Sequence, residues 1–198
     1  MAIVGLAALR HLLDDAITYE NLSAAKKFIE EGLRIAQEKQ WAAEIFYFKA
    51  QREIIEGNDR DAIVYLDLAI KHNPYDGAAY NDRALCMIAL GMAQEAISYF
   101  DQGIEREPDY ANIYHNKGWL LNKWGQHREA ILFFKKALEL EPDRAVTYEN
   151  LADAYVNLGS TQEAIKAFQK AAQLLSPSYP KIKEQIDAKI DLLAKGTL

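Results

Sequence analysis

Residues 111–143 read ANIYHNKGWLLNKWGQHREAILFFKKALELEPD and contain two amphipathic helical patterns joined by a short turn. The first pattern spans 111–124, the turn is Gly-Gln-His at 125–127, and the second pattern spans 128–140. Pro142 then blocks any continuation of the helix, because proline lacks the amide that a helix interior requires. The stretch therefore predicts an antiparallel helical hairpin.

A step of 34 residues repeats this pattern along most of the chain. A fixed period of this length that carries helical patterning is typical of proteins built from stacked repeats. The period aligns Gly57, Gly91, Gly125 and Gly159; Ala62, Ala96, Ala130 and Ala164; Phe46, Tyr80, Tyr114 and Tyr148; Leu66, Phe100, Phe134 and Phe168; and Pro74, Pro108 and Pro142.

This order of small, aromatic, alanine and proline positions resembles the tetratricopeptide repeat (TPR) family. The resemblance covers residues 43–176 and, with a weaker pattern, residues 3–37. The last full unit, AVTYENLADAYVNLGSTQEAIKAFQKAAQLLS, is similar to the family consensus along its whole length. The resemblance implies an all-α superhelical solenoid of antiparallel helix pairs.

We expect a single TPR domain over residues 1–198. Glycines at the helix turns are expected in the left-handed conformation, and Asn58 and Ser160 are expected to cap the helices that follow them. The expected parts are a degenerate first repeat at 2–40, regular repeats at 43–76, 77–110, 111–144 and 145–178, and a capping helix at 179–195.

The first predicted helix, residues 2–18, is apolar on more than one side. A helix of this kind is usually covered on both sides, and the second repeat can cover only one of them. We therefore predict a candidate oligomer interface at Ile3, Val4, Leu6 and Leu9. The next helix is expected to begin after Asn21 and to end near Gln37, followed by a three-residue insertion.

The composition of the chain disfavours several classes of function. The net charge of -6, from 23 Lys and Arg against 29 Asp and Glu, disfavours nucleic acid, which usually binds a basic surface. The single cysteine, Cys86, cannot form an intramolecular disulfide, and no segment has the length and apolarity of a membrane span. The opening residues lack the basic region of a signal peptide, so a cytoplasmic location is the default expectation.

The sequence offers no recognisable catalytic or cofactor-binding motif. It contains no GxxxxGK[ST], GxSxG, HExxH or GxGxxG pattern. Of its four histidines, only His11 has carboxylates at a helical spacing, Asp14 and Asp15, and this group is expected to be a solvated edge of the helix and not a metal site. Cys86 lies in the middle of a predicted helix, where a buried, unreactive thiol is expected. We therefore predict a protein that is not an enzyme and that needs no cofactor or metal.

The TPR resemblance implies that the first helices of the repeats line a concave surface and that one side of each helix contacts the ligand. We call these side chains the first-helix stripe. Large apolar groups beside amides suit a peptide-binding groove; the alternative is that Trp119 packs on a neighbouring repeat while the amides face water. The candidate residues are Tyr47, Gln51, Asn81, Leu85, Asn112, His115, Trp119, Asn122, Lys123, Glu149 and Asp153.

The predicted function is a non-catalytic adaptor or scaffold that binds a helical or extended segment of a partner protein. The alternative is a scaffold that assembles with itself through its apolar N-terminal helix. A third class, an RNA-binding helical repeat, is disfavoured by the acidic balance. The TPR subtype that holds acidic C-terminal tails is excluded, because the positions of its clamp have no basic residue here.

Overall fold

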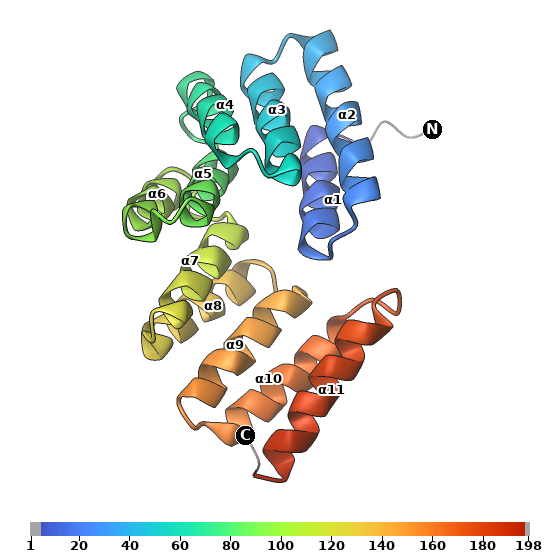
Figure 1. The fold of residues 1–198 in the computed structure, drawn as a ribbon, viewed down its shortest axis with the longest axis vertical. Coiled ribbons are helices and arrows are strands. Elements are labelled where there is room, and N and C mark those ends of the chain that lie inside the picture. The colour runs from blue at the N-terminus through green and yellow to red at the C-terminus, as the bar shows by residue number, and fades with distance from the viewer. Residues whose placement is uncertain (1–4, 197–198) are drawn as a thin grey trace. The chain divides into compact units, whose positions relative to one another are not determined.

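The computed structural model describes residues 5–196, and this part of the chain is helical throughout, with no strand. Within each hairpin the two helices run in opposite directions (Figure 1). They are α1 (Leu6–Thr18), α2 (Leu22–Lys39), α3 (Ala42–Glu56), α4 (Asp59–His72), α5 (Gly77–Ala89), α6 (Ala93–Arg106), α7 (Ala111–Lys123), α8 (His127–Leu140), α9 (Ala145–Asn157), α10 (Thr161–Leu174) and α11 (Pro180–Ala194).

The helices form two compact units, Met1–Pro108 and Asp109–Leu198, which we describe separately as the N-terminal and C-terminal units. The N-terminal unit holds the hairpins α1–α2, α3–α4 and α5–α6, with α2 against α3 and α4 against α5. The C-terminal unit holds the hairpins α7–α8 and α9–α10, with α8 against α9 and α11 against α10. The single-domain organisation expected from the sequence stays a prediction.

Glycine ends the first helix of each regular repeat, as the sequence predicts. Gly57, Gly91, Gly125 and Gly159 have φ between 71° and 81°, a left-handed conformation that is strained for residues with a Cβ. Asn21 caps α2 by accepting a hydrogen bond from the amide of Ala24 at 3.2 Å. The predicted side-chain caps at Asn58 and Ser160 are wrong, since neither makes a cap hydrogen bond, and the Asn58 amide donates to Glu53.

The second helix departs from the expected boundary at its C-terminal end. α2 continues to Lys39, and Gln40 then adopts a left-handed conformation with φ of 56°. Of the three residues expected as an insertion, Glu38 and Lys39 therefore extend α2, and Gln40 ends it. As a result, the first repeat is longer than the following ones by three residues.

Small residues let the helices of a hairpin approach closely. Ala62, Ala96, Ala130 and Ala164 have no exposed surface. In the α7–α8 hairpin, a Cβ added at Gly118 would lie 3.0 Å from the Phe134 ring and 3.2 Å from the carbonyl oxygen of Ala130. In this hairpin, a small residue of the first helix therefore lies directly against the backbone of the second helix at Ala130.

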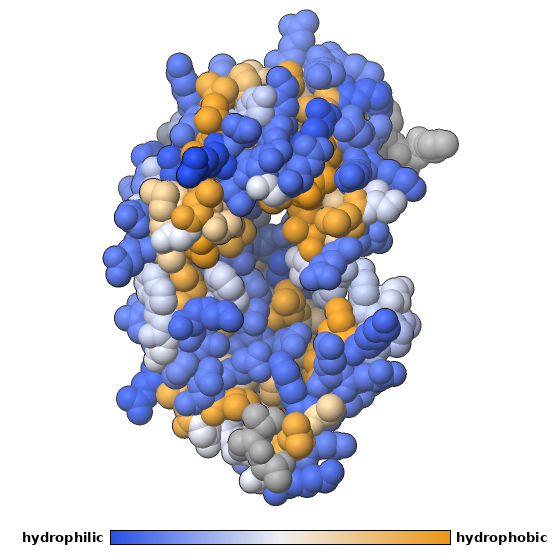
Figure 2. Space-filling view, viewed as in Figure 1, coloured by the Kyte–Doolittle hydropathy of each residue, from blue (hydrophilic) through white to orange (hydrophobic). Residues whose placement is uncertain are grey.

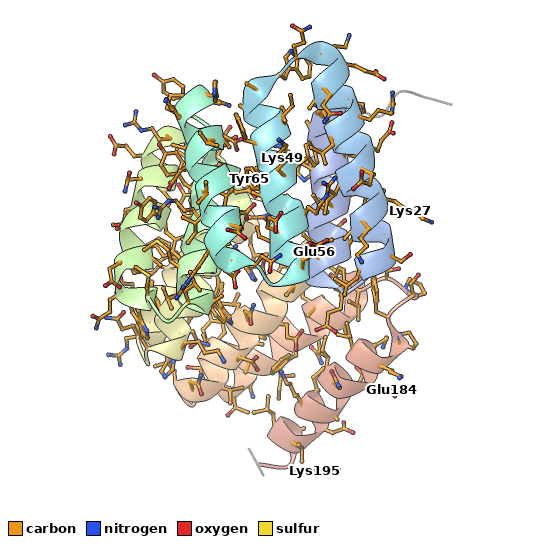
Figure 3. The ribbon with its side chains drawn as sticks, turned by 45° about the horizontal axis from the view of Figure 1, so that its top comes forward. Lys27, Lys49, Glu56, Tyr65, Glu184 and Lys195 are labelled. Atoms are coloured by element: carbon orange, nitrogen blue, oxygen red, sulfur yellow. The ribbon has the colours of Figure 1, made fainter. Side chains whose placement is uncertain are left out.

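Bulky side chains fill the space around these close contacts. Leu66, Phe100, Phe134 and Phe168, which the 34-residue period aligns, are buried to 1% exposure or less. Lys49 on α3 extends toward Tyr65 on α4, with its ammonium 5.6 Å from the ring centroid (Figure 3). Each regular repeat therefore contributes one fully buried side chain at this position, and in the α3–α4 hairpin a lysine lies beside an aromatic ring nearby.

The last helix covers one side of the final repeat. Ile186 and Leu193 of α11 are buried, at 1% and 4% exposure, whereas Lys181, Glu184 and Asp187 are exposed. This arrangement agrees with the predicted cap, which needs one apolar and one solvated side.

The exposed surface is mainly polar. Hydrophilic side chains cover most of the face shown in Figure 2, and hydrophobic residues appear there as separate patches. Of the described helices, none is long and apolar enough to cross a membrane.

Candidate functional site

The first-helix stripe of the N-terminal unit is more deeply buried than the sequence predicts. Tyr47 and Gln51 on α3 are 6% and 3% exposed, and Asn81 on α5 is 3% exposed, whereas Leu85 is partly exposed. Buried polar side chains need hydrogen-bond partners, because an unpaired buried donor or acceptor is costly. The partners of these residues come from the same unit.

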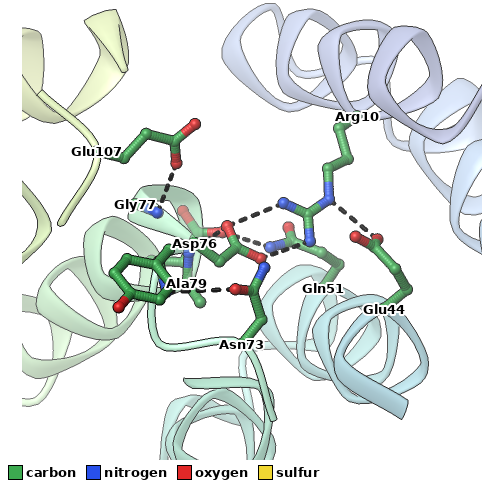
Figure 4. Close-up of polar contacts among 10 residues, drawn as sticks. Arg10, Glu44, Gln51, Asn73, Asp76, Gly77, Ala79 and Glu107 are labelled. Atoms are coloured by element: carbon green, nitrogen blue, oxygen red, sulfur yellow. Dashed lines mark hydrogen bonds and ion pairs between the residues drawn. The ribbon is translucent and has the colours of Figure 1, made fainter. Parts of the chain in front are cut away.

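Arg10 of α1 is the centre of a polar network on this stripe (Figure 4). Its guanidinium donates two hydrogen bonds to the Asp76 carboxylate at 2.9 and 2.7 Å, and a third to Glu44 at 3.2 Å. It also lies 3.6 Å from the centroid of the Tyr47 ring. Paired carboxylates and an aromatic face suit the planar guanidinium, so Arg10 joins α1, α3 and the start of α5.

Asp76 and Glu107 also satisfy the amides at the N-terminus of α5. The Asp76 carboxylate accepts a hydrogen bond from the amide of Ala79 at 3.3 Å, and Glu107 accepts one from the amide of Gly77 at 2.6 Å (Figure 4). Both carboxylates lie where the helix dipole favours negative charge. The network therefore fixes the position of α5 as well as that of α1.

Asp82 is a further acid beside this network and is partly buried. It accepts hydrogen bonds from the side-chain amides of Gln51, on α3, and of Asn81, at 2.9 Å. Burial raises the pKa of Asp82 to about 6, although these two hydrogen bonds favour the ionised form. The amides that were expected to bind a peptide backbone thus bind a carboxylate of the protein.

Sequence reasoning missed Arg10, Asp76 and Asp82 as part of this site. Arg10 lies 37 residues before Tyr47. This separation is one period of 34 residues plus the three extra residues 38–40 at the end of α2. Arg10 therefore occupies the stripe position of the first repeat. An alignment that allowed for the longer helix could have found it.

In the C-terminal unit, His115 of α7 is bonded through both ring nitrogens. Nδ1 lies 2.9 Å from the Thr147 hydroxyl and Nε2 lies 3.3 Å from the Asn150 side-chain amide, both on α9. The ring also lies 5.8 Å from that of Phe134. Burial lowers the pKa of His115 to about 3, and the positive charge of Arg144 acts in the same direction.

Trp119, Asn122 and Lys123 occupy the C-terminal half of α7. Lys123 is exposed, and its ammonium lies 5.9 Å from the centroid of the partly exposed Trp119 ring. Asn122 is bonded to His127 at 2.6 Å, at the start of α8. Asn112, near the other end of α7, is buried, and its amide donates to the Tyr110 hydroxyl at 3.2 Å. Lys123 is therefore the most accessible member of this set, Trp119 and Asn122 are partly exposed, and Asn112 is buried.

Glu149 and Asp153 on α9 are bonded to Lys189 of α11. The Lys189 ammonium lies 3.2 Å from Glu149 and 3.1 Å from Asp153, and the two carboxylates raise its pKa against the opposing effect of burial. Lys189 therefore faces the stripe of the last repeat and does not lie on the solvated side of the capping helix.

The candidate oligomer interface is only partly available. Leu9 is 3% exposed and belongs to the core of the N-terminal unit, so its assignment to an oligomer interface is wrong. Leu6 is partly exposed, and Leu12 on the same helix is 42% exposed. Ile3 and Val4 lie outside the described residues.

Cys86 is buried at 2% exposure. Burial raises the pKa of its thiol and so disfavours the reactive thiolate. The expected burial of the cysteine is confirmed. Within residues 5–196, no group of three His, Cys, Asp or Glu side chains is placed to hold a metal ion.

Repeated helical hairpins with a first-helix stripe define a class of helical repeat proteins that typically serve as protein-interaction modules. Two tetratricopeptide repeat models match the sequence, one over residues 75–143 and the other over 123–181, which together span more than half of the chain. The chain belongs to the tetratricopeptide repeat family. No curated protein sequence matches it.

Solved TPR structures share the fold at low sequence identity. TTC0263 from Thermus thermophilus is 20% identical, with a TM-score of 0.71 over 91% of this chain and 98% of that one. MamA from Desulfovibrio magneticus is 23% identical, with a TM-score of 0.60 over 77% and 89% of the two chains. YrrB, described as a TPR protein with an unusual peptide-binding site, is 16% identical, with a TM-score of 0.55 over 86% of both. These likenesses concern the fold alone.

Proposed function

We propose that the protein is a non-catalytic adaptor that binds a segment of a partner protein on its first-helix stripe. The observation that carries this proposal is the different exposure of the stripe residues. Tyr47, Gln51 and His115 are buried, whereas Trp119 and Leu85 are partly exposed and Lys123 is exposed. The partner-binding part of the stripe in the C-terminal unit is therefore Trp119 and Lys123, in the C-terminal half of α7.

Trp119 is the expected anchor of this surface. Its ring offers a large apolar area, and the neighbouring ammonium of Lys123, 5.9 Å from the ring centroid, can pair with an acceptor of the bound segment. Aromatic residues of this kind commonly contribute the largest share of binding energy at protein interfaces. YrrB, which has a similar fold, is a precedent for peptide binding by a TPR protein.

The test begins with peptides selected from a displayed library for binding to the full chain. Trp119→Ala is expected to weaken binding of the selected peptides at least about tenfold, or ~1.4 kcal/mol. Trp124→Ala is the matched control, because Trp124 is 42% exposed and lies at the helix turn, outside the stripe. Equal affinity of the Trp119 variant and the wild type, with both folded, would contradict the proposal.

Self-assembly through α1 is the second candidate function. The observation in its favour is Leu12, a large apolar side chain of α1 that is 42% exposed. Sedimentation of the full chain and of Leu12→Ser over a wide concentration range tests it. A monomer at every concentration would exclude this candidate without affecting the adaptor proposal.

A further inference from the structure

Three isoleucines occupy the same repeat position on the three first helices of the N-terminal unit. They are Ile17 on α1, Ile54 on α3 and Ile88 on α5, and all three are partly exposed. Ile54 and Ile88 lie one period of 34 residues apart, and Ile17 precedes Ile54 by one period plus the three extra residues of α2. We call these side chains the isoleucine row.

The isoleucine row lies on the same side of the helices as the polar network around Arg10. Each isoleucine lies seven residues after a stripe residue, in the pairs Arg10 and Ile17, Tyr47 and Ile54, and Asn81 and Ile88. Seven residues are about two helical turns, so both members of a pair lie on one side of their helix. The network joins the three helices through the contacts of Arg10 with Tyr47 and Asp76 (Figure 4). The row therefore forms an apolar band beside the network.

The core of the unit is built from other side chains. Phe48 on α3 and Ala84 on α5 have no exposed surface, whereas the isoleucine row keeps part of its surface exposed. Ile55 and Leu85, which are also partly exposed, extend the apolar band on α3 and α5. An apolar patch with a polar rim is typical of a surface that binds another protein.

The row is confined to the N-terminal unit. At the same repeat position, α7 has Asn122 and α9 has Val156. The two units therefore present different chemistry on their first helices, and a segment that fits one unit is not expected to fit the other.

Asp82 supplies negative charge beside this band. It lies three residues before Leu85 on α5, and the side-chain amides of Gln51 and Asn81 donate to its carboxylate. Both donors favour the ionised form and neither is a cation. The carboxylate of Asp14 on α1 acts on Asp82 with a charge of the same sign. A cation placed here would therefore meet an attractive field.

The nearby arginines are already paired with other acids. The Arg10 guanidinium is bound to Glu44 and Asp76, and Arg83 on α5 is bound to Asp67 on α4. The N-terminal unit also has an excess of acidic side chains, 18 Asp and Glu against 11 Lys and Arg in residues 1–108. Charge complementarity therefore favours a positively charged partner at this surface.

We propose that the isoleucine row and Asp82 form a second partner-binding surface, whose ligand is a protein segment with a lysine or arginine beside large aliphatic side chains. The aliphatic side chains pack on the row, and the cation pairs with the Asp82 carboxylate. The amides of Gln51 and Asn81 stay in place, because a carboxylate accepts more than two hydrogen bonds. This surface shares no residue with the one at Trp119 and Lys123.

The test uses the full chain with Trp119→Ala, which removes the anchor of the other surface. Peptides selected on this chain from a displayed random library are expected to place Lys or Arg beside Leu, Ile or Phe. Adding Ile54→Ser or Asp82→Asn should weaken their binding at least about tenfold, and the effect of Asp82→Asn should shrink at high salt. The matched controls Val64→Ser and Asp61→Asn replace exposed residues of α4 and should leave the affinity unchanged.

Methyl NMR of the wild-type protein with the same peptides needs no additional folded variant. The δ1 methyl signals of the isoleucine row should move, and those of Ile63 and Ile70, which are partly exposed on α4, should not. The proposal is overturned if the library yields no peptide or only peptides without a basic residue. Unchanged affinity after both Ile54→Ser and Asp82→Asn, or methyl changes centred on α4, would also overturn it. Because Trp119 is absent from the selection, failure of the Trp119 surface is a separate result.

Discussion

The two units fix their first helices with different chemistry. In the N-terminal unit a guanidinium, three carboxylates and two amides join α1, α3 and α5. In the C-terminal unit a neutral histidine, a hydroxyl and an amide join α7 to α9. Among the described residues of this unit's stripe, the ion pairs are those that Glu149 and Asp153 form with Lys189 of the capping helix. Within the same fold, the first helices can therefore be held in place by charged side chains or by uncharged ones.

The formal charges follow the same division. Residues 1–108 contain 11 Lys and Arg against 18 Asp and Glu, whereas residues 109–198 contain 12 against 11. The acidic balance of the chain thus belongs entirely to the N-terminal unit. Four variants or conditions test whether the two units differ in the way that these contacts imply.

Arg10→Met is expected to have the largest effect, because it leaves Asp76 and Glu44 without their cation. The free energy of unfolding of the N-terminal unit should fall by roughly 2–4 kcal/mol, somewhat less than for a fully buried pair since the Arg10 side chain is 19% exposed. Arg34→Met is the control, because its ion pairs are exposed to solvent and such pairs contribute little to stability. Denaturant titration followed by exchange of α3 and α5 amides measures both. Equal effects would remove the special role of Arg10.

Gly32→Ala is expected to be the next most damaging change. A Cβ at Gly32 would lie 2.3 Å from the ring of Phe48, which is completely buried and cannot move aside, so a loss of roughly 1–3 kcal/mol is expected. Gly118→Ala in the C-terminal unit should cost less, because its Cβ would lie 3.0 Å from Phe134 and a small shift suffices. Thermal unfolding of the two variants decides the order. The reverse order would show that the C-terminal unit is the more tightly packed.

Acidification from about pH 7 to pH 5 is expected to change the stability of the two units in opposite directions. The pKa of about 3 for His115 predicts a loss of ~2 kcal/mol in the C-terminal unit. The pKa of about 6 for Asp82 predicts a gain of ~1 kcal/mol in the N-terminal unit. Denaturation midpoints of wild type and Asp82→Asn at both pH values measure the second effect, and a gain that survives the substitution would assign it to another group.

Lys189→Met is expected to have the smallest effect on stability. The Lys189, Glu149 and Asp153 side chains are 35%, 26% and 40% exposed, and such pairs are typically worth less than about 1 kcal/mol. The loss should shrink further at high salt, because screening acts strongly on exposed charges. A loss well above this value, measured by urea denaturation, would indicate that α11 holds the last repeat through this contact rather than through Ile186 and Leu193.

The repeat period made most of the fold predictable. The turn glycines, the hairpins and the buried aromatic layer all follow from residues that recur at a fixed spacing, and local chemistry at Asn21 predicts the start of α2. The side-chain caps expected at Asn58 and Ser160 do not form, although both residues stand at the N-caps of their helices, and the Asn58 amide donates to Glu53. Helix boundaries therefore followed from the pattern more reliably than individual hydrogen bonds.

The site was less predictable, because its contacts join residues that are far apart in the sequence. Arg10 meets Glu44 and Asp76 across 34 and 66 residues, and Lys189 meets Asp153 across 36. The stripe positions themselves follow from the helical period. Which of them bind each other and which stay accessible depends on how successive hairpins pack, and no local pattern encodes that.

Chemical-shift mapping of the full chain with a selected peptide tests the adaptor proposal most directly. The account predicts that the largest changes fall on the indole of Trp119 and on the amides around Lys123, with smaller changes near Leu85. Val64 and Leu132, which are 57% and 66% exposed on second helices, should stay unchanged. Changes centred on Val64 or Leu132, with none at Trp119, would contradict the central claim that the first-helix stripe binds the partner.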